Sequence, residues 1–468
     1  MRGERADGAP VVEEGALAPV TKPPDPEQGV VICVDFGSTF TKASLVDLTE
    51  GSIAAAAEHR TTIDTDVLDG YDACLAALVD QDPRAADAPT LACSSAGGGL
   101  RIAVVGNEEL VTAEAGRRVA LSSGGKVVAV FAASRDDDLG ELPGSEPDVV
   151  LLTGGTDGGN PEPILACARA LAPLWRGPVV VAGNVDAQAD VAAILVHHPL
   201  VVAPNIVPRI GVLAPEGART AIRELFLSHV IGGKHLSSRD DFLAMVQGAT
   251  PDVVLTGVEL LAEVAGDTVV VDVGGATTDV HSVVELDPED AGLSREVVAT
   301  TRVTRTVEGD LGMRWSAVTT VEAAGRADLA EAAVRRRADV GFVPTDDAEA
   351  DLDEELAREA VGLALRRHAG RSKVVVSPEG RVVERSGKDL REVGVLVGSG
   401  GVLRHGRAGV AERVFAGSVG EVEGGWQLPR TANVTVDVQY VLAAAGLMAS
   451  DHPGAARRLV SRLTRRTP

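Results

Sequence analysis

The stretch 30-VVICVDFGSTFTK-42 carries the strongest signal for the fold. The apolar run VVICV is typical of a buried strand and places Asp35 at its carboxyl end. A turn rich in glycine and hydroxyl residues follows, and a second strand, Lys42 to Asp47, is predicted to complete a hairpin. Glycine lets the backbone approach a ligand closely, and consecutive N–H groups in such a turn can bind an anion. Because Asp35 would repel a phosphate, the pattern suits a phosphate that is bound with Mg²⁺ or its waters in between.

A second unit of the same kind occurs about 240 residues later, in the stretch 268-TVVVDVGGATTDV-280. Here the apolar strand delivers Asp272 to a turn of glycine and threonine, and another strand follows. One such turn is also explained as a tight hairpin whose glycines serve geometry alone. Two of them predict facing loops that grip a polyphosphate from both sides.

A third turn, Gly398-Ser399-Gly400-Gly401, follows the apolar run VGVLV. It would let the base and ribose of a nucleotide approach the backbone. A plain strand-to-helix turn explains the same residues equally well.

These three motifs resemble the phosphate-1, phosphate-2 and adenosine motifs of the actin/heat-shock chaperone/sugar kinase ATPase superfamily. More narrowly, the chain resembles the MutL-type accessory proteins of glutamate mutase, which are unrelated to mismatch repair. The supporting segments are SSAGGGLRIAVVG at Ser94, LLTGGTDGGN at Leu151, NIVP at Asn205, RTVEGDLGMR at Arg305 and DVQYVLAAAGLM at Asp437. The resemblance covers nearly the whole chain after an N-terminal tail.

The resemblance implies an ATP site that uses Mg²⁺. Asp35 and Asp272 would flank the metal, holding it through water, and would position the attacking water. The phosphates would be held by Gly37, Ser38, Thr39 and Thr41 from one lobe and by Gly274, Gly275, Thr277 and Thr278 from the other. Glu308 and Asp310 would lie on the ribose side, and Gly398, Ser399, Gly400 and Gly401 would receive the adenosine. Lys42 would contact phosphate or would be a strand residue that faces solvent.

Composition excludes several other classes of protein. With 44 Lys+Arg against 68 Asp+Glu, the net charge is −24, which disfavours nucleic acid as a partner. No apolar run approaches the ~18 residues of a membrane span, so no membrane partner is expected. The four cysteines are far apart and are expected to be reduced core residues of a cytoplasmic protein, which counts against an iron–sulfur electron-transfer activator.

The expected fold class is α/β, with two ribonuclease-H-like, actin-type ATPase lobes and an inserted flavodoxin-like α/β domain. The predicted ranges are 1–29 for a disordered tail, 30–124 for the first lobe, 125–265 for the inserted domain and 266–468 for the second lobe. Continuous apolar strands that alternate with helices between 125 and 208 indicate the parallel sheet of the insertion.

The function implied by the resemblance is ATP-dependent reactivation of an adenosylcobalamin-dependent mutase, with the mutase subunits as partners. The inserted domain would present a docking surface to the mutase. Two alternatives share the fold. A small-molecule kinase would need a dedicated base and an acceptor pocket, and no such base is identified beyond the two aspartates. A nucleotide-dependent scaffold would form filaments.

Overall fold

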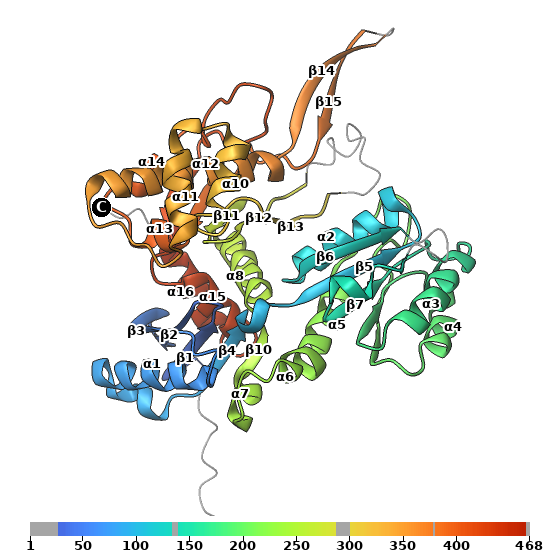
Figure 1. Cartoon of the computed structure of the whole chain (residues 1–468), viewed down its shortest axis with the longest axis horizontal. Helices are drawn as coiled ribbons and strands as arrows, with labels where there is room; N and C mark the ends of the chain where they lie inside the picture. The colour runs from blue at the N-terminus through green and yellow to red at the C-terminus, as the bar shows by residue number, and fades with distance from the viewer. Residues whose placement is uncertain (1–26, 133–138, 287–299, 378–379, 465–468) are drawn as a thin grey trace, which may run out of the picture.

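The computed structural model describes residues 27–132, 139–286, 300–377 and 380–464 (Figure 1). Most of the expected tail, 1–29, lies outside these described residues. Within them, no helix is both long enough and apolar enough to cross a membrane.

The first sheet contains the predicted hairpin and has the strand order β10-β4-β1-β2-β3. Its strands are β1 (Val30–Phe36), β2 (Phe40–Asp47), β3 (Ser52–Arg60), β4 (Thr90–Ser94) and β10 (Val246–Ala249). The first three strands pair antiparallel, whereas β4 runs parallel to β1 and β10 runs parallel to β4. Ile32 and Val34 on β1 are fully buried and belong to the same core as α1 (Val67–Gln81).

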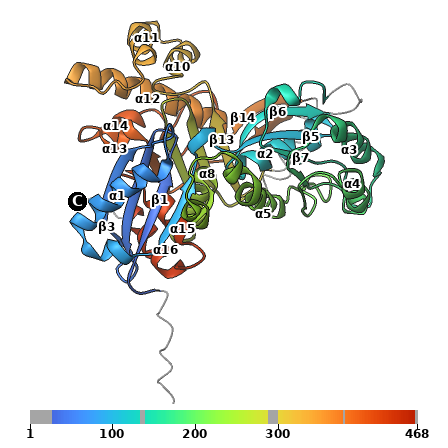
Figure 2. The same cartoon turned by 60° about the horizontal axis from the view of Figure 1, so that its bottom comes forward.

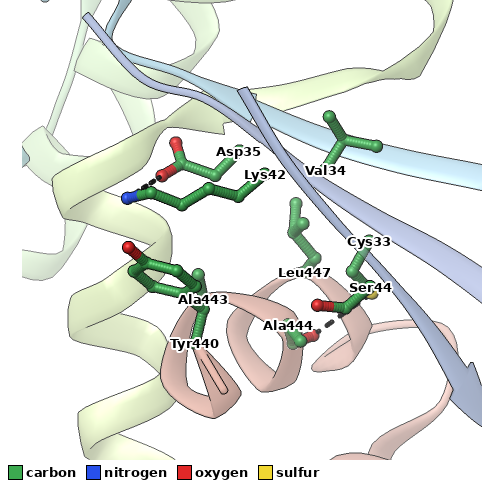
Figure 3. A pocket seen from close by; sticks show the side chains of 9 residues that line it. All are labelled: Cys33, Val34, Asp35, Lys42, Ser44, Tyr440, Ala443, Ala444 and Leu447. Carbon is green, nitrogen blue, oxygen red and sulfur yellow. Dashed lines mark hydrogen bonds and ion pairs between the residues drawn. The ribbon is translucent and has the colours of Figure 1, made fainter. Parts of the chain in front are cut away.

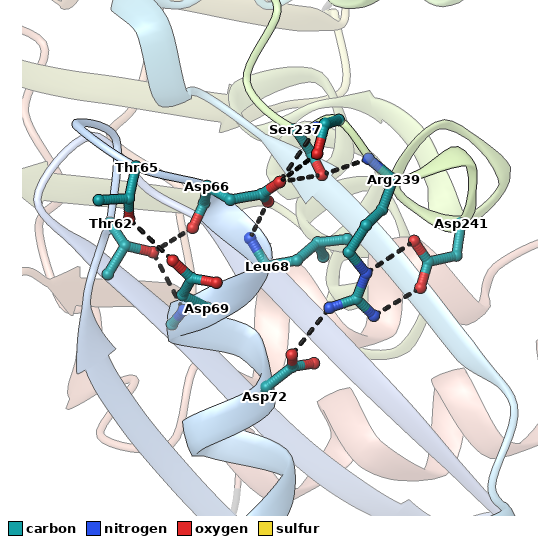
Figure 4. Close-up of polar contacts among 11 residues, drawn as sticks. Thr62, Thr65, Asp66, Leu68, Asp69, Asp72, Ser237, Arg239 and Asp241 are labelled. Carbon is teal, nitrogen blue, oxygen red and sulfur yellow. Dashed lines mark hydrogen bonds and ion pairs between the residues drawn. The ribbon is translucent and has the colours of Figure 1, made fainter.

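Asp66, which caps the start of helix α1, also binds the distant segment around Ser237 (Figure 4). One carboxylate oxygen of Asp66 accepts the N–H of Leu68 at 2.9 Å, and the other accepts the hydroxyl of Ser237 at 2.9 Å. Arg239 donates to Asp72 on α1 at 2.7 Å. Burial raises the pKa of Asp66, but the hydrogen bonds that its carboxylate accepts lower the pKa by more. The net shift is therefore downward. These contacts hold the segment that precedes β10 against the first sheet.

The second sheet repeats the architecture of the first. Its order is β13-β12-β11-β16-β17, with β13 (Val303–Glu308), β12 (Thr278–Val283), β11 (Thr268–Val273), β16 (Val395–Ser399) and β17 (Asn433–Val436). Again, the antiparallel hairpin and its outer strand lie on one side, and two parallel strands lie on the other. The prediction of two similar α/β lobes is therefore confirmed.

Three helices lie between the two sheets (Figures 1 and 2). They are α8 (Thr250–Ala265), α15 (Val441–Met448) and α16 (Pro453–Val460). Their apolar residues form one core cluster with Val31 of β1 and Val270 of β11. Since α8 follows β10 of the first sheet and leads into β11 of the second, it connects the two lobes directly.

The third sheet is entirely parallel, with the order β6-β5-β7-β8-β9. Its strands are β5 (Arg101–Gly106), β6 (Lys126–Ala132), β7 (Val149–Leu152), β8 (Val179–Val181) and β9 (Leu200–Val202). Counted along the chain this is the order 2-1-3-4-5 of flavodoxin-like sheets. Helices cover both faces: α2 (Glu114–Ser122) and α5 (Glu216–Leu225) on one, and α3 (Glu162–Leu174) and α4 (Gln188–Ile194) on the other. On β7, Leu151 faces the first pair of helices and Leu152 the second, which explains why the strand is a continuous apolar run.

The sheets divide the chain at points that differ from the expected boundaries. Strand β5 and helix α2, expected within the first lobe (30–124), belong to the third sheet. Strand β10, expected within 125–265, pairs with β4 of the first sheet. The reason is that β5 is flanked by the same glycine-rich segments as a lobe strand, and only its pairing partners distinguish the two sheets.

The remaining helices surround the second sheet and the return to the first. They are α10 (Ala317–Ala324), α11 (Ala330–Ala338), α12 (Asp347–His368), α13 (Gly401–Arg404), α14 (Val410–Val414), α6 (Ile231–Gly233) and α7 (Asp240–Met245). A hairpin of β14 (Arg371–Ser377) and β15 (Gly380–Ser386) projects from the second lobe (Figure 1).

Candidate functional site

The two glycine-rich turns have the same local structure. Asp35 is the second-last residue of β1, and Asp272 is the second-last residue of β11. Each turn is closed by a backbone hydrogen bond, from Gly37 N–H to Phe40 at 3.1 Å and from Gly274 N–H to Thr277 at 2.8 Å. A Cβ on Gly37 would lie 2.6 Å from the Phe40 carbonyl oxygen, so this turn requires glycine.

Asp35 is held from two neighbouring elements. The hydroxyl of Thr250, the first residue of α8, donates to Asp35 Oδ1 at 2.6 Å. The thiol of Cys93 on β4 lies 3.7 Å from the same oxygen. The other oxygen, Oδ2, lies 3.8 Å from the ammonium group of Lys42, the residue directly opposite Asp35 on β2. Asp35 is therefore fixed in orientation, with one oxygen turned toward Lys42.

Lys42 points toward the start of α15, one of the helices between the two sheets (Figure 3). Its ammonium nitrogen lies 3.9 Å from the ring centroid of Tyr440, the N-cap residue of α15. Burial lowers the pKa of Lys42, but the negative charges of Asp35 and Asp272 and a hydrogen bond with Tyr440 raise it, and the net shift is upward. Lys42 is thus a charged group held near both aspartates.

Asp272 lies where several charges act on it. Its side chain is accessible to solvent, yet the surrounding protein desolvates the carboxylate and raises its pKa. The like charge of Asp279 raises the pKa further, while Lys42 and a hydrogen bond from Ser399 lower it. The charge of Asp35 raises the pKa of Asp272 too, so the carboxylates of the two turns interact electrostatically although they stand on different sheets.

Backbone carbonyls of the second turn point toward the loop 309–316. The carbonyls of Gly274 and Gly275 accept the N–H groups of Met313 at 3.0 Å and Arg314 at 2.8 Å. The carbonyl of Ala276 accepts the hydroxyl of Ser316 at 2.6 Å. In a trans peptide the N–H points opposite to the carbonyl, so the following N–H groups face away from the loop 309–316. This is the arrangement of a backbone anion site.

Two of the threonines predicted to bind phosphate are buried, and their hydroxyls contact other groups of the protein. Thr41 is fully buried and its hydroxyl lies 3.3 Å from that of Thr61. Thr278 is also fully buried and donates to the carbonyl of Leu311 at 3.1 Å. In contrast, Ser38 and Thr39 at the first turn are exposed and Thr277 at the second is partly exposed, together with Gly274 and Gly275.

The turn 398–401 lies directly beside the second turn. β16 runs parallel to β11, and Ser399 is the register partner of Asp272. Gly400 has a φ of 106°, and a Cβ there would lie 2.2 Å from the carbonyl oxygen of Val273. A Cβ on Gly398 would collide with Leu403 and Phe415, whereas Gly401 has open space around it. Close packing therefore explains Gly398 and Gly400 in part, and Ser399 contacts the site itself.

Glu308 and Asp310 lie at the same end of the second sheet. Glu308 ends β13 and pairs in register with Thr278. Both carboxylates bind Arg367 of α12, at 2.7 Å for Glu308 and 2.6 Å for Asp310. These hydrogen bonds lower the pKa of Asp310.

Sequence reasoning missed Thr250, Tyr440 and Arg404, all of which lie at the site. Arg404 lies 3.9 Å from the Tyr440 ring centroid and donates to Glu58 on β3 at 3.0 Å. Tyr440 stands inside the segment DVQYVLAAAGLM, which drew attention as a whole but not for this residue. Thr250 is the first residue of α8, and nothing in the sequence points to its contact with Asp35.

The donor set fits Mg²⁺ better than a transition metal. Among the described residues, no group of three or more His, Cys, Asp or Glu side chains could hold a metal ion. Asp35 and Asp272 offer hard oxygen ligands, and mutual repulsion of their charges favours a cation between them. An ion held by two carboxylates would take its other ligands from water and phosphate.

Comparison with known proteins agrees with the resemblance drawn from the motifs. A family model described as "MutL protein" matches residues 31–463. Protein MutL of Clostridium tetanomorphum is 35% identical over 454 residues, covering 92% of this chain and 98% of the relative. Among solved structures, nucleotide-free acetone carboxylase has a TM-score of 0.40 at 17% identity, covering 90% of this chain and 70% of the other. The activator of 2-hydroxyisocaproyl-CoA dehydratase from Clostridium difficile, with bound ADPNP, has a TM-score of 0.32 at 11% identity, covering 94% and 99%. On the family model and the sequence relative, the chain belongs to the MutL protein family.

Proposed function

We propose that this protein is an ATP-dependent accessory factor that reactivates an adenosylcobalamin-dependent mutase such as glutamate mutase. The observation that carries the nucleotide part is the pair Asp35 and Asp272, at equivalent positions of two equivalent sheets and close enough to interact electrostatically. The family membership supports the accessory role.

In this proposal the nucleotide lies between the lobes. Backbone N–H groups of both turns bind the phosphates, with the exposed hydroxyls of Ser38 and Thr39 as further donors. The turn 398–401 receives the adenosine, and Asp310 lies on the ribose side beside Arg367. Lys42 adds a positive charge from the first lobe.

Asp35 and Asp272 would hold Mg²⁺, and the bound ion would supply neutralisation of the phosphate charge. The raised pKa of Asp272 suits a carboxylate that orients the attacking water and accepts its proton. Thr250 keeps Asp35 in position because its hydroxyl occupies Oδ1. Hydrolysis would change the closure of the lobes about α8, and the unit built on the third sheet would present a surface to the mutase.

The test is ATP hydrolysis with Mg²⁺ by the wild type and by Asp272→Asn, with and without an inactivated mutase and fresh adenosylcobalamin. We expect hydrolysis by the wild type, recovery of mutase turnover, and a loss of at least about 100-fold in kcat for Asp272→Asn. Asp190→Asn, on the exposed surface of α4, is the matched control and should hydrolyse ATP normally.

The outcomes separate the parts of the proposal. ATP hydrolysis without recovery of any adenosylcobalamin-dependent mutase would refute the proposed partner but not the proposed ATPase activity. Undiminished hydrolysis by Asp272→Asn would refute the catalytic assignment. If the wild type does not bind ATP, the two turns serve architecture alone.

A further inference from the structure

Lys42 is a long, flexible side chain that reaches a fixed place. It stands on β2 of the first lobe, and its ammonium group lies 3.8 Å from Asp35 Oδ2. An unrestrained lysine side chain carries about 2 kcal/mol of rotamer entropy, so a defined position needs several contacts. The other close contact of the ammonium group is the Tyr440 ring, at 3.9 Å from the centroid, at the start of α15.

Tyr440 is itself held in an unusual backbone conformation. Its φ is 55°, in the left-handed region that residues other than glycine rarely adopt. Directly after it, α15 begins, and the buried carboxylate of Asp437 accepts the N–H groups of Val441 at 2.8 Å and Leu442 at 3.0 Å. A residue in such a conformation costs about 1 kcal/mol or more, and the cost is tolerated where the surroundings determine the backbone. The cap by Asp437 supplies that constraint and fixes where the ring of Tyr440 projects.

Arg404 of the second lobe contacts the same ring and also reaches the first lobe. It follows the turn 398–401, lies 3.9 Å from the Tyr440 centroid and donates to the Val438 carbonyl at 2.7 Å. Its guanidinium group also bonds Glu58 of the first lobe at 3.0 Å. Glu58 on β3 is the register partner of Lys42 on β2. The contact of Lys42 with Tyr440 and the contact of Glu58 with Arg404 therefore start from adjacent strands.

The space beneath this contact is small. A cavity of about 10 Å³ lies between β1 and α15, and its lining includes Cys33, Ser44 and Leu447 together with Lys42 and Tyr440 (Figure 3). This is room for about one water molecule. The cavity therefore leaves little room for water beside the Lys42 side chain, and the close neighbour of its ammonium group is the Tyr440 ring.

We propose that Tyr440 is a positioning residue that holds Lys42 beside Asp35 from the start of α15, the helix between the lobes, with Arg404 of the second lobe, itself bonded to Glu58 of the first, fixing the ring. The inference rests on the proposed function, in which Lys42 serves the nucleotide. It adds that the place of Lys42 depends on how the lobes are arranged, because the ring of Tyr440 is held by Arg404, which belongs to the second lobe. A change in lobe closure would then move the cation relative to Asp35.

The first experiment needs no nucleotide. The rate at which an N-hydroxysuccinimide ester acylates Lys42 is measured by mass spectrometry in EDTA, relative to the exposed Lys126. We expect Tyr440→Leu to raise the relative rate at Lys42 about fivefold or more, and Tyr440→Phe, which keeps the ring, to raise it less. An unchanged rate in Tyr440→Leu would overturn the proposal. Tyr71→Phe alters the other of the two tyrosines of the chain and is the control.

The second experiment tests whether Tyr440 acts through Lys42. The Kd for ATP with Mg²⁺ is measured for the wild type, Tyr440→Leu, Lys42→Met and the double variant, with thermal unfolding to confirm folding. We expect Tyr440→Leu to weaken binding about fivefold in the wild-type background and less than about twofold in the Lys42→Met background. Equal factors in both backgrounds would overturn the proposal. If the wild type binds no ATP, the proposed function fails, while the acylation rates still report on the contact.

Discussion

Two buried basic side chains share one hydroxyl group in the second lobe. His368 lies 2.7 Å from the hydroxyl of Ser282, and Lys388 donates to the same hydroxyl at 3.1 Å. Lys388 also donates to Thr304 at 2.8 Å and to the carbonyl of Arg302 at 2.9 Å. Burial lowers the pKa of Lys388 to about 7, although the charge of Asp267 opposes the shift, and burial likewise lowers the pKa of His368.

The titration of Lys388 predicts a pH dependence of stability. The folded pKa lies below the ordinary value of about 10.4, so between about pH 7 and pH 10 the unfolded chain binds a proton that the folded chain does not. Burying Lys388 therefore lowers the free energy of unfolding most at low pH. This loss of stability disappears as the pH rises from about 7 to about 10. The free energy of unfolding of the wild type should rise relative to Lys388→Met by up to about 1.4 kcal/mol per pH unit.

Urea unfolding between pH 6 and pH 9 measures this difference directly. Lys373→Met, at an exposed position of β14, is the matched control and should show no such change with pH. A constant difference between the wild type and Lys388→Met would mean that Lys388 remains charged in the folded protein.

At the scale of elements, the central strands and the two turns could be predicted from the sequence. β1 and β11 are apolar because both faces of each sheet are covered, and the motifs at Asp35 and Asp272 stand out because glycine is required there. The short outer strands β10, β13 and β17 were not predicted. β10 and β17 have four residues each, and β13 mixes polar and apolar residues, so neither length nor pattern distinguishes them from loops.

The site was predictable where one strand and its turn build it, and not where elements meet. Each phosphate turn is local, since a single strand places its aspartate beside the turn, although Thr41 and Thr278 are buried and bond within the protein. The contacts of Thr250 with Asp35 and of Tyr440 with Lys42 join residues about 200 and 400 positions apart in the chain. Neither pair leaves a local pattern, because threonine and tyrosine at a helix start have many other uses.

The crossing of α8 and α15 depends on two glycines that face opposite ways. A Cβ on Gly257 would lie 2.1 Å from the Leu442 carbonyl oxygen, and one on Gly446 would lie 2.0 Å from that of Val253. Gly446→Ala must push apart the helices that connect the lobes. We expect it to lower the free energy of unfolding by about 1–3 kcal/mol, measured by urea denaturation.

Gly362→Ala provides the comparison for this helix crossing. Gly362 lies inside α12, and its Cβ would meet nothing closer than the Ser418 hydroxyl at 3.8 Å. There the same substitution should stabilise the protein by about 0.5–1 kcal/mol, because alanine loses less backbone entropy. Destabilisation of similar size at both positions would contradict the packing explanation.

At the scale of the whole molecule, the third sheet is joined to the second through one buried arginine. Arg305 on β13 is 5% exposed and bonds Asp279 at 2.6 Å. On its other side it donates to the carbonyls of Leu121 at 3.0 Å and Gly125 at 3.2 Å, at the end of α2. Since Asp279 raises the pKa of Asp272, this contact also lies within electrostatic reach of the candidate site.

Loss of the arginine should have two separable effects. Arg305→Met leaves the carboxylate of Asp279 without its partner, which should cost about 3–5 kcal/mol of unfolding free energy, and it removes the link to α2. Adding Asp279→Asn should restore much of that stability, since no unpaired charge remains, but it cannot restore the link. Hydrogen exchange in α2 should therefore stay faster than in the wild type in both variants, while calorimetry shows the partial recovery. If Asp279→Asn also restored the protection of α2, the link between the third sheet and the second lobe would depend on the charge balance at Asp279 and not on the bonds that Arg305 makes to the end of α2.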